Sequence, residues 1–156
     1  MSRKATFGAG CFWGVEARFR QVPGVIDAKV GYMGGDVENP SYEQVCTDTT
    51  GHVEVVEVEF DADAVGFETL ARAFFSMHDP TQVNRQGPDV GTQYRSVIFY
   101  HDEDQKSLAE NVLDQMNRSG RFPGPIATSI EPAGEFWMAE DYHQRYLERR
   151  DSSCSI

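Results

Sequence analysis

The chain has 156 residues, of which 40% are hydrophobic and 12% aromatic, and its formal net charge is −11. This length suits a single domain with one core, and the negative charge disfavours nucleic acids and anionic membranes, whose phosphates would repel the surface. The sequence shows no signal peptide and no membrane-spanning apolar run, and its three widely spaced cysteines do not form a secreted disulfide framework, so we expect a cytoplasmic protein.

The first half of the chain alternates between strand and helix patterns. Alternating residues and short apolar runs bounded by turn residues predict strands over 4–7, 25–32 and 53–60. Apolar residues at helical spacing predict helices over 15–19 and 67–78. The segment between Met33 and Tyr42 is rich in glycine and is expected to be a loop.

The second half opens with a long polar loop over 79–93, a length that is typical of functional loops. Strands follow over 95–101 and 126–130, and helices over 102–118 and 139–149. This order predicts an α+β fold, a ferredoxin-like split β-α-β two-layer sandwich with an additional C-terminal helix. We expect residues 1–150 to form a single catalytic domain and 151–156 a flexible C-terminal tail that carries Cys154.

A cysteine framed by glycines lies at the first strand-to-helix junction, where Gly8, Gly10 and Gly14 surround Cys11. A thiol at a helix start faces unpaired backbone N–H groups and the positive end of the helix dipole, which favours the thiolate. A dinucleotide fingerprint would need a glycine where Trp13 stands, and a metal site would need a second ligand nearby, so neither fits. A buried structural cysteine is the alternative to a reactive one.

Glu54 is the next informative residue, because the strand over 53–60 places it on the same face as Val56 and Val58. A carboxyl group on that apolar face would lose hydration, so its pKa should rise toward the range that suits a general acid. The alternative is a solvated Glu54 at a frayed strand end.

The four histidines give weaker signals. His52 could act as a base for Cys11, as in a cysteine acyl hydrolase. His78 falls on an apolar helix face and is expected to be structural, whereas His101 and His143 are expected on the surface.

Two tyrosines and two further thiols complete the set of candidate residues. Tyr42 and Tyr94 stand beside loops, where a hydroxyl could donate to a bound oxygen or serve only in packing. Cys154 could reach another sulfur from the tail, and Cys46 is expected to be a small packing residue.

The most specific motif of the chain is Gly10-Cys11-Phe12-Trp13-Gly14. Further blocks with it cover residues 31–35, 39–46, 50–54, 78–80, 91–96, 135–137, 139–144 and 146–147. In this motif and in the order of these blocks the chain resembles the peptide methionine sulfoxide reductase A family, which acts on the S epimer of methionine sulfoxide.

In this family Cys11 would be the nucleophile that attacks the sulfoxide sulfur, and Glu54 the acid that protonates the oxygen. The resemblance implies that Tyr42 and Tyr94 hydrogen-bond that oxygen. It also implies an apolar pocket for the substrate methyl group from Phe12 and Trp13, and a role in holding substrate or water for Asp89.

The resemblance further implies a Cys11 sulfenic acid that a second thiol converts to an intramolecular disulfide. Cys154 is the tail candidate for that thiol, with Cys46 as the other possibility. Thioredoxin or another dithiol would be the external reductant, with no bound cofactor or metal. The substrates would be oxidised proteins or peptides, and we expect a monomer.

Two other functions stay open on the residues alone. One is a cysteine acyl hydrolase that uses Cys11 and His52. The other is a peptide-binding module anchored by Phe12 and Trp13, whose binding would not depend on the oxidation of Cys11.

Overall fold

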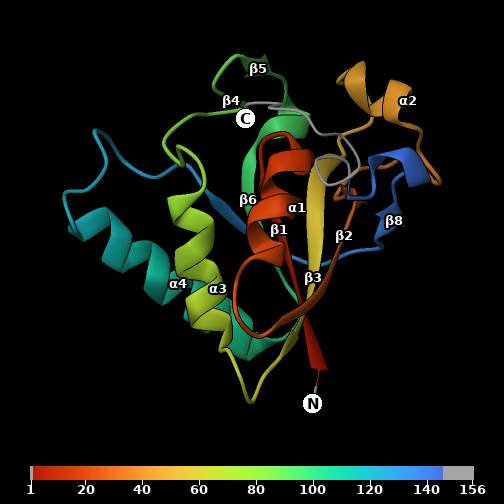
Figure 1. Ribbon diagram of the computed structural model, residues 1–156. Helices are drawn as coiled ribbons and strands as arrows, with labels where there is room; N and C mark the ends of the chain where they lie inside the picture. Colours follow the sequence, from red (N-terminus) through yellow and green to blue (C-terminus); the bar gives the residue numbers. More distant parts are fainter. Residues whose placement is uncertain (1, 146–156) are drawn as a thin grey trace.

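The computed structural model describes residues 2–145, and a sheet forms its centre (Figure 1). The six strands of this sheet are β1 (Ser2–Ala9), β2 (Val25–Met33), β3 (Val53–Asp61), β6 (Ser96–Tyr100), β7 (Ser129–Pro132) and β8 (Trp137–Met138). The helices are α1 (Phe12–Arg20), α2 (Tyr42–Cys46), α3 (Phe67–Ser76) and α4 (Glu103–Arg118). The sheet order is β7-β6-β1-β3-β2-β8.

The predicted split β-α-β topology is confirmed in the four middle strands. The units β1-α1-β2 and β3-α3-β6 interleave, so that every contact among these strands is antiparallel. Helix α4 then returns the chain to β7, which pairs parallel to β6 at one edge of the sheet. At the other edge β8 pairs antiparallel to β2 and brings the end of the described chain beside the first half.

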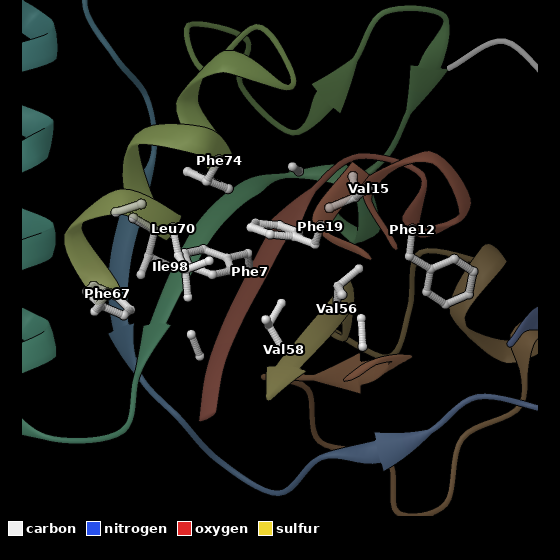
Figure 2. Packing of buried hydrophobic residues seen from close by; sticks show 14 of the residues in the cluster. Phe7, Phe12, Val15, Phe19, Val56, Val58, Phe67, Leu70, Phe74 and Ile98 are labelled. Carbon is white, nitrogen blue, oxygen red and sulfur yellow. The ribbon is translucent and has the colours of Figure 1, made fainter. Parts of the chain in front are cut away.

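The main core lies between one face of the sheet and helices α1, α3 and α4 (Figure 2). Phe7 from β1 is at its centre, and its ring stacks on Phe19, Phe67 and Phe74 at centroid distances of 5.0, 5.9 and 5.3 Å. These contacts fix both neighbouring helices against β1. Because Phe7 belongs to β1 and Phe19 to the last turn of α1, these contacts hold the two elements that flank Cys11.

A second, smaller apolar cluster covers the opposite face of the sheet. It contains Met33, Val53, Val55, Val97 and Phe99. Because of this cluster the first residues of β3 are buried on both faces, unlike the rest of that strand. Within residues 2–145, none of the helices combines the length and the apolar character needed to cross a membrane.

The structure corrects several expected elements. Residues 126–128 are not part of a strand, and β7 begins three residues later than expected. Residues 34–41 form a loop as expected, and the short helix α2, which was not expected, begins at Tyr42. The long polar loop contains a small hairpin of β4 (Arg85–Gln86) and β5 (Asp89–Val90). It also ends in the 3-10 turn η1 (Thr92–Tyr94).

The largest correction concerns the predicted helix over 139–149. Its described part contains only the 3-10 turn η2 (Asp141–His143), and Gln144 after it is extended. The Arg145 N–H donates to Glu16 Oε1 at 2.8 Å, whereas in the predicted helix it would donate to Asp141 O. Bonds to other parts of the fold therefore override the local helical preference.

Candidate active site

The candidate site lies at one end of the sheet, where β1 and β2 finish and β3 and β6 begin. The register brings this about, because Tyr32 near the end of β2 is paired with Glu54 near the start of β3. Ala9 at the end of β1 is likewise paired with Ser96 at the start of β6. Residues far apart in the sequence are thus brought together at one end of the sheet.

Cys11 occupies the predicted strand-to-helix junction as the N-cap residue of α1, and it is half-buried. Gly10 before it has φ of 96°, a left-handed conformation that favours glycine. A Cβ on Gly10 would lie 2.8 Å from the Gln86 side chain, and one on Gly8 would lie 2.7 Å from Val53. The glycines therefore allow both the turn and the close approach of neighbouring elements.

Glu54 is buried, with 1% of its surface exposed, so the expectation drawn from strand parity holds and the frayed-end alternative does not. The Phe12 backbone N–H donates to Glu54 Oε1 at 3.3 Å. The other oxygen, Oε2, has no hydrogen-bond partner among the described residues. Burial raises the pKa of Glu54 to about 8; the Phe12 hydrogen bond opposes this rise and the charge of Asp89 adds to it. The carboxyl group is therefore protonated at neutral pH.

An aromatic group surrounds this carboxyl. The Tyr42 ring stacks on Phe12 and on Trp13, in each case at a centroid distance of 6.4 Å. Phe12 is 1% exposed, whereas Trp13 is only partly buried. Phe12 therefore lies in the core, and Trp13 lies nearer to solvent.

Tyr42 opens α2, whose first turn is fixed by a capping box. The Ser41 hydroxyl accepts from Gln44 N at 3.2 Å, and the Gln44 side chain accepts from Ser41 N at 2.8 Å. The Tyr42 N–H donates to Glu140 Oε2 at 3.0 Å. Burial and the nearby charge of Glu54 raise the pKa of the Tyr42 hydroxyl, so it remains a hydrogen-bond donor.

Tyr94 and Asp89 come from the loop that was expected to be functional. Tyr94 ends η1, which packs against β3. Burial raises the pKa of its hydroxyl, and the charges of Glu54, Asp89 and Cys11 contribute further. Asp89 lies in β5 and interacts electrostatically with Glu54. The structure therefore brings together all of the sequence-derived site residues except Cys154, which lies outside the described residues.

His52 does not fit the role of a catalytic base. Its Nδ1 accepts from Gly35 N at 3.1 Å, and its Nε2 lies 2.6 Å from Val37 O. Both ring nitrogens therefore serve to hold the segment after β2. The acyl hydrolase alternative loses the residue on which it depends.

Three expectations about other residues need revision or extension. Cys46 is exposed rather than packed, and its thiol hydrogen-bonds Tyr42. His143 is buried rather than at the surface. Glu140, which the sequence analysis did not single out, also accepts from the Tyr32 hydroxyl at 3.1 Å. The only signal for the last two was their position in a block that resembles the family, because the predicted helix suggested a solvated face.

Comparison with known proteins agrees with this geometry. The family model described as peptide methionine sulfoxide reductase matches residues 3–156. Peptide methionine sulfoxide reductase MsrA of Acidobacterium capsulatum is 60% identical over 154 residues, which cover 98% of this chain and 99% of that protein. The crystal structure of Mxr1 from Saccharomyces cerevisiae in reduced form is 37% identical, with a TM-score of 0.91 over 99% of this chain and 88% of that one. The structure of Mxr1 in complex with Trx2 is 28% identical, with a TM-score of 0.64 over 93% and 84% of the two chains.

Proposed function

The chain belongs to the peptide methionine sulfoxide reductase family, and on that premise we propose a mechanism in which Cys11 is the nucleophile and Glu54 the proton donor. The reaction is the reduction of methionine-S-sulfoxide, in peptides or as the free amino acid, to methionine. The observation that carries the assignment is the protonated, buried carboxyl of Glu54. One of its oxygens bonds the residue after Cys11, and the other has no partner among residues 2–145.

The first step joins the Cys11 sulfur to the sulfoxide sulfur while the sulfoxide oxygen takes the proton of Glu54. The bond between that oxygen and the substrate sulfur and the new bond between the two sulfurs then both break; the oxygen passes with its proton to Cys11 as a sulfenic acid, and methionine leaves with the electron pair of the S–S bond. Methionine sulfur is thereby reduced by two electrons and Cys11 is oxidised by two. A thiolate at the start of α1 is favoured by the helix dipole, as this step requires.

The surrounding residues have distinct roles in this proposal. Tyr42 and Tyr94 keep their protons and donate hydrogen bonds to the sulfoxide oxygen. Phe12 and Trp13 form the apolar pocket for the methyl group, which turns the sulfur toward Cys11. Asp89 helps to hold substrate or water at the rim and keeps Glu54 protonated through its charge.

Cys154 is proposed as the thiol that attacks the sulfenic acid, releases water and forms a disulfide with Cys11. Chain length supports this role. The Arg145 N–H donates to Glu16 Oε1 at 2.8 Å, and Glu16 lies five residues after Cys11, a rise of about 7.5 Å along a helix. A chain of nine residues, 146–154, can span at most about 30 Å, which is several times the rise between Cys11 and Glu16.

Thioredoxin is proposed as the reductant of that disulfide. The support is the likeness to Mxr1, which was solved in complex with Trx2. Oxidised proteins and peptides would be the substrates, and we propose a cytoplasmic monomer that needs no bound cofactor.

The decisive assay follows both epimers of a blocked methionine sulfoxide with the purified protein and a dithiol. We expect only the S epimer to be consumed, and Cys11→Ser to lose at least a thousandfold in kcat/KM because no other group can form the first bond. His52→Ala serves as the control for the hydrolase alternative and should retain the reductase reaction. Activity that persists in Cys11→Ser would refute the mechanism.

A single turnover without reductant tests the resolving thiol. Mass spectrometry should then find one methionine released and a disulfide between Cys11 and Cys154. A bond between Cys11 and Cys46, or a stable sulfenic acid, would contradict the role of Cys154 and leave the first step unaffected.

A further inference from the structure

His143 is buried among the aromatic side chains of the site although it comes from the far end of the described chain. The Trp13 indole N–H donates to His143 Nδ1 at 3.0 Å, across a sequence separation of 130 residues. The two rings stack with their centroids 5.5 Å apart and their planes 28° apart. The Tyr42 ring also contacts His143, and the centroids of these two rings are 4.4 Å apart.

This hydrogen bond requires one protonation state of the imidazole. An indole can only donate, so His143 Nδ1 must be the acceptor and the proton of the neutral ring must be on Nε2. Burial lowers the pKa of His143, an effect that the charge of Glu140 opposes, so the neutral ring prevails near pH 7. A protonated ring would direct a second N–H at the indole and break the contact.

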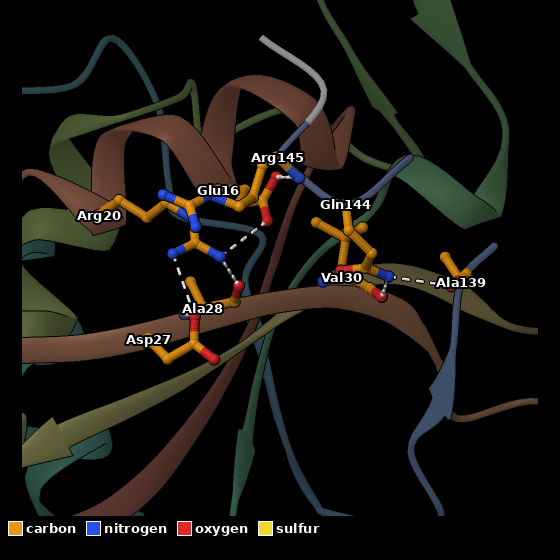
Figure 3. A network of polar contacts seen from close by, with 8 residues as sticks. All are labelled: Glu16, Arg20, Asp27, Ala28, Val30, Ala139, Gln144 and Arg145. Atoms are coloured by element: carbon orange, nitrogen blue, oxygen red, sulfur yellow. Dashed lines mark hydrogen bonds and ion pairs between the residues drawn. The ribbon is translucent and has the colours of Figure 1, made fainter. Parts of the chain in front are cut away.

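The backbone that carries His143 is fixed independently of Trp13. We name residues 139–145 the strap. The Gln144 side-chain amide donates to Val30 O and to Ala139 O at 2.9 Å and accepts from Val30 N at 3.0 Å (Figure 3). The end of the strap is tied to α1, where Glu16 accepts the Arg145 N–H. On the other side of His143 the Ala139 N–H donates to Val30 O at 3.0 Å, so the strap is anchored on both sides of that residue, to β2 and to the helix that follows Cys11.

A role in packing alone does not account for this residue. His143 is 1% exposed, and its Nε2 has no hydrogen-bond partner among the described residues. Burying a donor without a partner costs stability, and an aromatic hydrocarbon ring would avoid that cost. What a hydrocarbon ring could not supply is the acceptor for the Trp13 indole.

We infer that His143 is a positioning residue that holds the Trp13 indole in the wall of the substrate's methyl pocket. The inference rests on the proposed function, in which Trp13 contacts the methyl group. His143 itself touches no reacting atom and acts through Trp13. In this way the buried acceptor His143, which lies on the strap, sets the orientation of the Trp13 side chain near solvent.

The test compares two variants in a Trp137→Phe background, which leaves Trp13 as the sole indole in the chain. His143→Phe keeps an aromatic ring and removes the acceptor. His143→Asn removes the ring but keeps an oxygen near the position of Nδ1. The first readout is the indole N–H resonance in a ¹⁵N–¹H spectrum, which moves downfield when that group is hydrogen-bonded to nitrogen or oxygen.

We expect this resonance to move upfield in His143→Phe and to return most of the way in His143→Asn. The second readout is steady-state kinetics with blocked methionine-S-sulfoxide. KM should rise roughly five- to tenfold in His143→Phe, the range for losing one hydrogen bond, while kcat changes less than twofold. His143→Asn should recover most of the KM.

Each contrary result has a definite meaning. An unchanged indole resonance in His143→Phe would overturn the inference, whatever the kinetics show. A shifted resonance with an unchanged KM would overturn the positioning role. If the parent protein reduced no sulfoxide although its indole resonance lay downfield, the proposed function would fail while the contact stood.

A double-mutant cycle guards against poor folding of His143→Phe. In a Trp13→Phe background, His143→Phe should have no further effect on KM, because the indole that His143 positions is gone. A further increase there would show that His143 acts by another route and would refute the inference.

Discussion

At the residue scale, the site depends on buried polar side chains of one kind. In each of them one polar atom takes part in a hydrogen bond, and the other has no hydrogen-bond partner among the described residues. Glu54 and His143 share this arrangement. The alternation of β3 indicated that Glu54 shares the apolar face, because side chains of one parity share a face, but it left a solvated strand end open. Nothing comparable was available for His143, since its burial depends on bonds between segments more than a hundred residues apart. Local periodicity cannot carry that information.

The protonation of Glu54 should be visible in the pH dependence of stability. In the folded protein its pKa is about 8, whereas in the unfolded chain it returns to about 4.5, so unfolding releases a proton between these values. The stability that the buried neutral carboxyl contributes is therefore complete below pH 4.5 and is lost as the pH rises to about 8. Relative to Glu54→Gln, which does not titrate, the wild type should lose up to about 1.4 kcal/mol per pH unit in this window.

Urea unfolding of both proteins at pH 5, 6, 7 and 8 measures this difference. Comparing two proteins at each pH cancels the other titrating groups, including His78, whose pKa burial lowers to about 4. A difference in unfolding free energy that stays constant from pH 5 to 8 would show that Glu54 is already ionised in the folded state.

At the element scale, long periodic segments were predictable and short ones were not. Helices α1, α3 and α4 and strands β1, β2, β3 and β6 were expected near their observed positions, because each carries an apolar pattern long enough to be recognised. The short helix α2 is held by its cap and by Glu140 rather than by periodicity. The strap resembles a helix in sequence, but its Gln144 and Glu140 side chains bond to β2 and α2, and its Arg145 backbone N–H bonds to α1.

The cap of α2 should matter for catalysis because Tyr42 is the first residue of that helix. Ser41→Ala removes the acceptor for Gln44 N and should cost about 1 kcal/mol of stability. We expect kcat/KM to fall several-fold as well, since the first turn positions the Tyr42 hydroxyl.

Asp102→Ala is the matched control for this change. Asp102 caps α4 by accepting from Gln105 N at 2.8 Å, and α4 packs on α3, β6 and β7 rather than on the site residues. Chemical denaturation should show similar losses for both variants, with a loss of activity only in Ser41→Ala. Equal activities would mean that the position of Tyr42 does not depend on its cap.

At the scale of the whole molecule, the split β-α-β topology could be predicted from the order of elements. The bounds of the two edge strands, β7 and β8, could not be predicted from the sequence. Strand β7 began later than expected, and β8 has only two residues, too few for a period to be recognised. The end of the described chain nevertheless completes the site, because β8 and the strap lie along β2. The site is thus formed by several segments that the sheet brings together, and no single motif forms it.

A substitution on β2 can test this dependence. A Cβ on Gly31 would lie 2.5 Å from Trp137 O and 2.6 Å from the Phe136 ring, so Gly31→Ala should displace β8 and loosen the strap behind it. We expect a loss of about 2 kcal/mol or more, as in other overpacked sites, and a greatly raised KM. Gly134→Ala, whose Cβ would meet nothing within 4 Å, should be nearly neutral in thermal unfolding and in kinetics. If both variants behaved alike, the pocket would not require close docking of β8.

The contacts of the strap have a consequence for the order of folding. They close loops of 98 to 130 residues, the separations of Glu140 from Tyr42 and of His143 from Trp13, and such contacts form late because closing a long loop costs entropy first. During synthesis the nucleophile leaves the ribosome more than a hundred residues before the strap that completes its site. A nascent chain therefore carries the reactive thiol before it carries the complete site.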